Sequence, residues 1–365
     1  MEISTTKIVE ALAKVKDPKS GQDLITMNMV RDLVVEGNNV NFTIELASLD
    51  SDHKQELNFA CIGAIQDLYP MANVNVHMMA TTDQAKQTAG VLPHVKNIIA
   101  VASGKGGVGK STIAVNMALG LKALGAKVGL IDADLYGPSI PTMLGLQGQR
   151  PKIQDHYNQP KIMPLEAYGI SVMSIGFIIE PEQAVVLRGP RLSGIIKQFI
   201  NDCMWPPLDY LVIDLPPGTG DIQLSLVQTV PVTGAVMVTT PQEVAVVDAV
   251  KAMNMFLLPS VNVPILGVVE NMSWFTPKEL PDNKYFLFGE GGGKTLAKAS
   301  KSVLLGQVPI VQGIREGGDQ GKPIVMEKDN PSANAFMEIA KNVVRQVAVR
   351  HEVLAPTKRV DVNHQ

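Results

Sequence analysis

The sequence predicts an α/β fold, in which a parallel β-sheet carries helices on both faces, preceded by a small α+β domain. From residue 96 onward, short apolar runs alternate with helical patterns, as in repeated βαβ units. Residues 5–80 show helix and hairpin patterns of their own. Apolar residues make up 45% of the 365 residues and charged residues only 18%, against about 25% in typical soluble domains, so much of the chain must be buried.

The first domain, residues 1–80, is predicted to mix helices with strands. Ile8, Leu12 and Val15 recur at helical spacing, and Asp17 before a proline ends that helix. Gly37 and the asparagines after it are typical of a hairpin turn between two strands. The other predicted elements of this domain are strands over 25–35, 40–47 and 74–79 and a helix over 54–68.

A polar linker over 81–95 leads to the second domain, residues 96–350, and a polar tail over 351–365 follows. The predicted strands of this domain cover residues 97–102, 127–131, 170–175, 210–213, 235–239, 265–269 and 304–308, and its last helix covers 334–349. An uncharged run between Asp221 and Glu243 is about as long as a bilayer crossing, but its glutamines, prolines and glycines favour a buried helix followed by a buried strand. We therefore expect no membrane-spanning segment.

A glycine-rich loop follows the first strand of the second domain and opens a helical pattern. It satisfies G-x-x-x-x-G-K-[ST] with Gly104, Lys105, Gly106, Gly107, Val108, Gly109, Lys110, Ser111 and Thr112. The glycines allow the backbone N–H groups to wrap a phosphate at the positive end of the helix. We expect Lys110 to reach the β- and γ-phosphates and Ser111 to ligate Mg²⁺. The strand, loop and helix together predict a P-loop NTPase domain.

The same loop also fits the dinucleotide-binding pattern G-x-G-x-x-G. Asp132 lies about twenty residues further on, where an acidic residue would bind a ribose. An NAD-dependent oxidoreductase is therefore an alternative interpretation. Lys110 argues against it, because a dinucleotide site has no use for a lysine at that position.

A second glycine-rich segment, residues 289–295, resembles the first. Phe288 stands where its first glycine should be, and no apolar strand runs directly into it. We interpret it as a flexible turn before a helix.

Acidic residues end two of the predicted neighbouring strands, where ligands lie in open α/β sheets. Asp214 follows an apolar strand, which predicts a carboxylate that holds Mg²⁺ through water. Gly218 and Gly220 follow it, as in a loop that senses a γ-phosphate. Asp132 and Asp134 end the other strand, and one of them should orient the attacking water. Spacing alone leaves both possible.

Composition narrows the functional classes further. The net charge of −3 argues against a general polyanion binder, so we expect no nucleic-acid partner, and the tail lacks a basic amphipathic helix for a membrane surface. Two cysteines cannot build a disulfide framework, and the first residues lack the basic-then-apolar layout of a signal peptide. We expect a cytoplasmic protein.

Four motifs together resemble the Mrp/ApbC iron-sulfur cluster carriers, P-loop ATPases related to the Min and Par proteins that carry a second, signature lysine, here Lys105. The motifs besides the loop begin at Asp132 (DADLYGPS), Asp214 (DLPPGTGD), Thr239 (TTPQ) and Glu270 (ENMS). The N-terminal domain is similar to a small domain found in iron-sulfur assembly proteins. The resemblance covers most of residues 96–350.

The resemblance implies an ATP-hydrolysing homodimer that carries iron-sulfur clusters to client apoproteins. It implies that Lys105 acts across the dimer on the partner subunit's nucleotide, in the manner of an arginine finger. It further implies that Asp134 serves the catalytic water, that Asn271 contacts the adenine base, and that Lys105, Lys110 and Asp134 are the catalytic residues. The implied cofactors are ATP, Mg²⁺ and a 4Fe-4S cluster shared between subunits.

The sequence departs from this family at the cluster ligands. Members typically hold the cluster through a C-x-x-C pair shortly after the Asn271 segment, and this chain has no cysteine after Cys203. The usual cysteine of the small domain is also missing near residues 48–51. Cys61 and Cys203 read most simply as core residues. Two alternatives to a cluster carrier therefore stay open: an ATP-gated adaptor that binds no cluster, and a nucleotide-switched positioning ATPase of the Min/Par kind.

Overall fold

We analysed a computed structural model of the chain. It describes residues 3–18, 21–46, 51–80, 92–134, 137–156, 159–178, 189–277, 279–280, 282–327, 330–354 and 357. The described residues form two compact units. The smaller unit contains the described residues up to 80, with 124–126 and 343–354, and the larger contains 92–123, 127–342 and residue 357. The expected linker falls mostly outside the described residues, as do the expected cysteine neighbourhood at 48–50 and most of the tail.

The smaller unit is a three-stranded sheet with two helices, as its sequence predicts. Its elements are α1 (Thr5–Leu12), β1 (Val30–Glu36), β2 (Asn39–Leu46), α2 (Ser51–Gln66) and β3 (Asn73–Ala80). β1 and β2 form an antiparallel hairpin that closes between Glu36 and Asn39, and β3 adds in parallel to β2. Alternate residues of β2 are fully or nearly buried, since one face of the sheet packs on the core.

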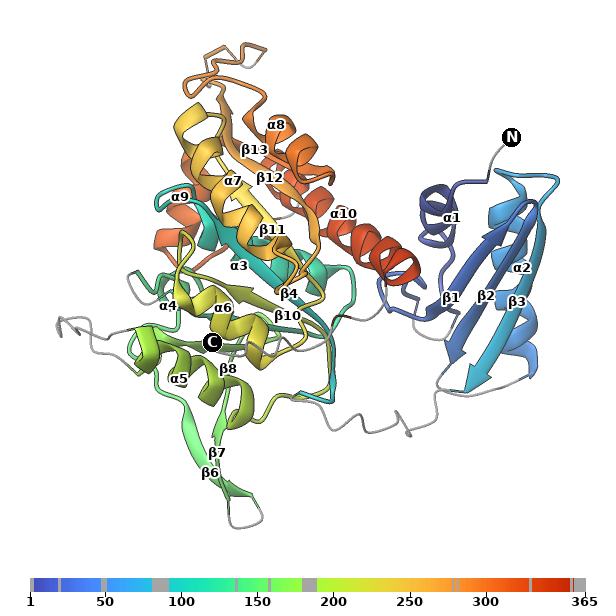
Figure 1. Ribbon diagram of the computed structural model, residues 1–365, viewed down its shortest axis with the longest axis horizontal. Helices are drawn as coiled ribbons and strands as arrows, with labels where there is room; N and C mark the ends of the chain where they lie inside the picture. Colours follow the sequence, from blue (N-terminus) through green and yellow to red (C-terminus); the bar gives the residue numbers. More distant parts are fainter. Residues whose placement is uncertain are drawn as a thin grey trace. The chain divides into compact units, whose positions relative to one another are not determined.

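The larger unit is built on one eight-stranded sheet (Figure 1). Its strands are β4 (Val95–Ser103), β5 (Val128–Asp132), β8 (Leu165–Ala167), β9 (Ile170–Ser174), β10 (Leu208–Asp214), β11 (Gly234–Thr239), β12 (Ile265–Phe275) and β13 (Leu304–Ile310). The strand order is β13-β12-β11-β4-β10-β5-β9-β8, parallel except for the edge strand β8. All seven strands predicted for this domain are found, and β4, which feeds the glycine-rich loop, lies near the centre.

Helices cover both faces of this sheet, because the parallel strands are apolar on both sides. The helices of the larger unit are α3 (Lys110–Ala123), α4 (Ile140–Met143), α5 (Gly189–Asn201), α6 (Asp221–Thr229), α7 (Glu243–Leu257), α8 (Gly292–Ala299) and α9 (Gln312–Asp319), and α10 (Pro331–Val353) begins in it. Buried residues of α5, α6, α7 and α8 share one core with Ile98, Ala100 and Ala102 of β4. On α3, Gly120 lies close against Ala340 of α10. The α/β prediction is confirmed.

The register of the sheet aligns three polar residues at its carboxyl edge. Asp214 of β10 is paired with Asp132 of β5, and Asp132 with Ser174 of β9. β4 lies on the other side of β10 and runs directly into the glycine-rich loop. The topology thus brings the loop and both acidic strand ends to one edge of the sheet.

Several features differ from the sequence prediction or were missed. The edge strand β8 was not predicted, and the strand expected over 25–35 begins only at Val30. A two-stranded hairpin, β6 (Lys152–His156) and β7 (Gln159–Met163), projects from the larger unit (Figure 1). The β12 strand continues six residues beyond its predicted end at 269. Helix α10 continues to Val353, so the first residues of the predicted tail are helical. Among the described residues, no helix has the length and apolarity needed to cross a membrane.

Candidate nucleotide-binding site

The glycine-rich loop surrounds a cavity of about 380 Å³ at the carboxyl end of β4. Residues 105–112 of the loop line it, together with Ser103, Asp134, Gly137, Ser139, Met143 and Pro217. The loop ends where α3 begins at Lys110, so backbone N–H groups of the first helical turn face the cavity. Ser139 and Pro217 belong to the motifs that begin at Asp132 and Asp214, whereas Met143 has no local signal in the sequence, and the fold brings all three to the cavity.

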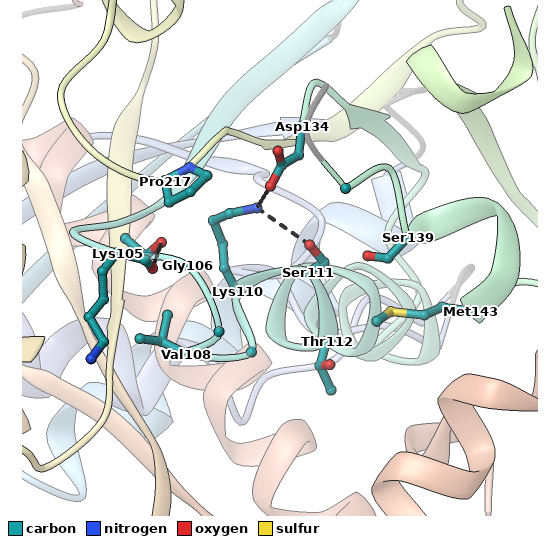
Figure 2. A pocket seen from close by; sticks show the side chains of 14 residues that line it. Lys105, Gly106, Val108, Lys110, Ser111, Thr112, Asp134, Ser139, Met143 and Pro217 are labelled. Atoms are coloured by element: carbon teal, nitrogen blue, oxygen red, sulfur yellow. Dashed lines mark hydrogen bonds and ion pairs between the residues drawn. The ribbon is translucent and has the colours of Figure 1, made fainter. Parts of the chain in front are cut away.

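Lys110 forms the electrostatic centre of the site. Its side chain is buried, and its Nζ lies 2.6 Å from Oδ1 of Asp214 and 3.4 Å from Oδ2 of Asp134. The Ser111 hydroxyl lies 3.4 Å from the same nitrogen. Figure 2 shows Lys110 extended between Asp134 and Ser111 across the cavity. The ammonium group therefore lies between two carboxylates, one at the end of β10 and the other in the loop after β5.

Asp214 is fully buried, and one of its oxygens is unsatisfied. Burial raises the pKa of this carboxyl above its usual value, and the neighbouring Lys110 ammonium opposes that rise. Asp214 Oδ2 has no hydrogen-bond partner in the described part of the structure. A buried carboxylate oxygen without a donor is costly, and a hydrated Mg²⁺ would satisfy it. The donor set of Asp214 and the Ser111 hydroxyl thus fits a magnesium ion.

The structure separates the two acidic residues that spacing left equivalent. Asp132 is completely buried, accepts a hydrogen bond from the Ser174 hydroxyl at 2.9 Å, and accepts another from the Asp134 backbone N–H at 3.1 Å. Its pKa is raised to about 8, mainly by burial and secondly by the charge of Asp214. Asp134 instead lines the cavity. Asp132 therefore positions the loop, and it cannot reach a ribose as the dinucleotide alternative requires.

The glycines of the loop serve different purposes. A Cβ on Gly104 would lie 2.1 Å from the backbone carbon of Asp248, so this glycine lets β4 approach helix α7. A Cβ on Gly109 would overlap the Asn271 amide at 2.2 Å. Gly107 has a φ of 80°, a conformation that glycine adopts without strain. Gly104 is not among the residues that line the cavity, and its place among the phosphate-binding residues stays a prediction.

Lys105 also lines the cavity but does not join the ion pairs around Lys110. Figure 2 shows its amine directed away from Lys110 and Ser111. Ser103 Oγ donates to the Lys105 carbonyl oxygen at 3.1 Å, which fixes the backbone and leaves the side chain to extend outward.

Asn271 of β12 contacts the glycine-rich loop at Val108. It is buried, and its Nδ2 donates to the Val108 carbonyl oxygen at 2.9 Å, so it ties β12 to the loop. Asn271 lines a second cavity of about 660 Å³ that shares Gly109 and Thr112 with the first. The second cavity is mostly apolar, and Ile310 and Ile314 form part of its wall. The two cavities adjoin along the loop.

The loop after Asp214 is held by hydrogen bonds. Gly218 N–H donates to the Ser103 carbonyl oxygen at 2.8 Å, so in this structure it does not face the cavity as expected for phosphate sensing. The Gln223 amide donates to the carbonyl oxygens of Pro216 and Gly218 at 2.9 and 3.0 Å. Gln223 was missed by the sequence analysis, since a single glutamine in a helical pattern carries no local signal.

In the second glycine-rich segment, a glutamate side chain of the same chain accepts a hydrogen bond from the backbone at the start of the following helix. Glu270 is buried in the middle of β12, and its carboxylate accepts from the Gly293 N–H at 2.6 Å and from Gln307 Nε2 at 2.6 Å. Gly293 lies in the first turn of α8, where an external anion would otherwise bind. The interpretation of this segment as a turn before a helix is confirmed.

Neither cysteine is placed to bind a metal in the described structure. Cys61 lies in the core of the smaller unit and Cys203 is buried in the larger one, and burial raises both thiol pKa values to about 12. Across the ranges that the structure describes, no group of three or more His, Cys, Asp or Glu residues is arranged to hold a metal ion. The residues present do not fit a cluster held by thiolates.

Two family models together match most of the chain. Residues 94–344 match the ParA model, described as the NUBPL iron-transfer P-loop NTPase. Residues 5–78 match the model described as the iron-sulfur cluster assembly protein.

Curated relatives match nearly the whole chain. The iron-sulfur cluster carrier protein of Synechocystis sp. is 46% identical, over 95% of this chain and 99% of its own. The iron-sulfur cluster carrier protein of Haemophilus influenzae is 41% identical, over 92% of this chain and 90% of its own.

Solved structures resemble the larger unit. A nucleotide-binding protein of Archaeoglobus fulgidus in complex with ADP and containing cobalt is 36% identical, with a TM-score of 0.57 over 68% of this chain and 94% of that one. The septum site-determining protein MinD of Pyrococcus horikoshii with Mg-ADP has a TM-score of 0.52 at 22% identity, over 70% of this chain and 98% of that one, which shows a shared fold. The extent of the sequence matches establishes that the chain belongs to the iron-transfer P-loop NTPase family of iron-sulfur cluster carriers.

Proposed function

We propose that the chain binds and hydrolyses ATP in the cavity around Lys110. The observation that carries this proposal is the contact of the Lys110 ammonium with both Asp214 and Asp134 at the mouth of a glycine-rich loop. Lys110 would bind the β- and γ-phosphates, Ser111 and Asp214 would hold Mg²⁺, the latter through water, and residues 104–112 would position the phosphate chain. Magnesium, when bound, would neutralise charge on the phosphates.

Nucleotide binding would also release the catalytic carboxylate. Asp134 pairs with Lys110 at 3.4 Å in the structure. Phosphate oxygens are stronger ligands for that ammonium because they carry more charge, so Lys110 turns toward them when ATP enters. Asp134 is then available to orient the attacking water. Hydrolysis would thus be coupled to the arrival of the γ-phosphate.

The adenine base would lie in the second cavity, next to Asn271. That cavity adjoins the phosphate loop through Gly109 and Thr112, and it is apolar enough to receive an aromatic ring. Asn271 Nδ2 is already bonded to the Val108 carbonyl oxygen. Its remaining amide oxygen is the group we assign to the base.

We propose that the active form is a homodimer in which Lys105 acts on the partner subunit's nucleotide. Its amine points away from Lys110 in the same chain, which supports an action on a phosphate outside this site (Figure 2). A cation added to the developing charge in this way acts in the transition state.

We propose that this ATPase works in iron-sulfur cluster assembly and in transfer to client apoproteins in the cytoplasm, as the names of its relatives suggest. A 4Fe-4S cluster would be its cargo. The second candidate function, an ATP-gated adaptor that binds no cluster, is favoured by one observation. Both cysteines are buried, with thiol pKa values raised to about 12.

Anaerobic reconstitution distinguishes these two functions. Wild type and the double variant Cys61→Ala/Cys203→Ala would be purified without oxygen and incubated with iron and sulfide, and bound iron and sulfide would be counted. For the carrier, we expect cluster absorption in wild type. Retention of the cluster in the double variant would assign it to other ligands, and loss would assign it to the cysteines. If the wild-type protein bound neither iron nor sulfide and showed no cluster absorption, the carrier function would be excluded and the ATP-gated adaptor would be supported.

A further inference from the structure

The last residues of β12 and the chain that leads from them toward α8 form an arm that starts and ends in the second cavity. We define the β12–α8 arm as residues 272–288, of which 278 and 281 lie outside the described residues. It is closed near its root by Phe275 and Tyr285, whose backbones exchange hydrogen bonds of 2.9 and 2.8 Å. Lys284 Nζ lies 4.3 Å from the centre of the Trp274 ring. These contacts join the two strands of the arm to one another.

Both roots of the arm contribute to the cavity wall. Met272, which has a φ of 55°, lines the cavity on the outgoing side, directly after Asn271. Leu287 and Phe288 line it on the returning side. The opposite wall comes from β13 and α9, and Gly109 and Thr112 connect it to the phosphate loop. A ligand in this cavity therefore touches the arm at both of its ends.

Leu287 is the large apolar residue of this cavity wall whose side chain is exposed to solvent. Its side chain is 61% exposed although it borders a cavity of about 660 Å³. Phe286, its neighbour, is also exposed at 45% but does not line the cavity. An aromatic ring placed in the cavity would bury Leu287 and gain apolar contact, while a phosphate chain alone would not reach it.

We infer that Leu287 and Phe288 are positioning residues through which a bound base, rather than the bound phosphates, orders the β12–α8 arm. The inference rests on the proposed nucleotide function. When a base is bound in the cavity, Leu287 and Phe288 pack through it against the opposite wall. Because the Phe275 and Tyr285 backbones are hydrogen-bonded to each other, this packing also restricts the motion of the neighbouring Trp274. The arm then reports that a base is bound, whatever the number of phosphates attached to it.

Two ligands separate the base from the phosphates. ADP fills both cavities, and inorganic tripolyphosphate can fill only the phosphate cavity. The chain has two tryptophans, so the variant Trp205→Phe leaves Trp274 as the single fluorescent reporter on the arm. We expect ADP to reduce acrylamide quenching of Trp274 and to shift its emission, and tripolyphosphate to bind without either change.

A matched pair of variants in the otherwise native chain tests the residues themselves by calorimetric titration. Leu287→Ser should weaken ADP binding by about tenfold and leave tripolyphosphate binding unchanged, because it removes apolar contact with the base. Phe286→Ser, the control, should change neither. Equal quenching changes with both ligands, or equal affinities in both variants, would overturn the inference alone. Failure of both ligands to bind wild type would overturn the proposed nucleotide function, and this inference with it.

Discussion

At the scale of single residues, two carboxylates of the site contact the Lys110 ammonium group, which is also the group expected to bind phosphate. Asp214 and Asp134 contact Lys110 where phosphate oxygens would otherwise bind, and Asp214 retains a second, unsatisfied oxygen. Removing two carboxylates from water is costly, and the lysine offsets part of that cost. A nucleotide with its metal ion would satisfy all three groups together, which accounts for a buried charged cluster in an otherwise apolar sheet.

The role of Lys105 can be separated from that of Lys110 by substitution. Lys105→Ala should lower kcat by about 10³-fold or more, as removal of an arginine finger does, and should change nucleotide affinity little. The measurements are hydrolysis at saturating ATP and equilibrium binding of ADP. Lys110→Ala serves as the comparison, since it should weaken binding as well. A Lys105→Ala rate equal to wild type would contradict the proposed action across the dimer.

The raised pKa of Asp132 predicts a pH dependence of stability without nucleotide. In the unfolded chain this carboxyl ionises near its ordinary value of 3.8, and in the folded protein near 8. Between these values the folded state holds the additional proton, so stability falls as pH rises through this window, by up to about 1.4 kcal/mol per pH unit.

The variant Asp132→Asn removes this ionisation while keeping the shape of the side chain. Its melting temperature relative to wild type should therefore be more favourable at pH 8 than at pH 5. Ser174→Ala, which removes a hydrogen bond to Asp132 and leaves its charge, is the control. A difference between Asp132→Asn and wild type that is independent of pH would show that Asp132 is ionised throughout.

At the scale of elements, the glycine-rich loop is shaped as much by packing as by its ligand. Gly104→Ala would force a Cβ into the backbone of α7 at Asp248, where neither partner can yield by rotating a side chain. We expect a loss of roughly 1–3 kcal/mol in the free energy of unfolding, measured with urea. Gly106→Ala, whose new Cβ would have Pro217 at 4.0 Å as its nearest neighbour, should lose much less.

The sequence allowed the central elements to be predicted and the peripheral ones only in part. The inner strands of the large sheet are buried on both faces, so each appears as an apolar run, while the short edge strand β8 does not and was missed. The hairpin of β6 and β7 is exposed along most of its length and has no such pattern. Likewise, Lys110, Asp214 and Asp134 lie in local motifs. Leu287 and Ile314, which line opposite walls of one cavity, come from segments that only the fold brings together.

At the scale of the whole molecule, the two cysteines are inaccessible in both units. Their raised thiol pKa values mean that almost no thiolate forms at neutral pH. We expect native protein to react very slowly with a thiol reagent such as dithionitrobenzoate, and protein in guanidinium to react at two thiols per chain, the number in the sequence. Rapid labelling of native protein would show that at least one thiol can reach solvent and could serve as a ligand.

The buried Glu270 carboxylate affects how many of the two glycine-rich turns can bind an external anion. Two glycine-rich turns of the larger unit lead into helices, one into α3 and the other into α8. At the turn before α8, the Glu270 carboxylate already accepts a hydrogen bond from the helix backbone. If the proposed function is right, the chain binds one nucleotide, because the Glu270 side chain occupies the turn that leads into α8. Glu270→Ala would open that turn, and phosphate titration by calorimetry should then detect an additional weak site.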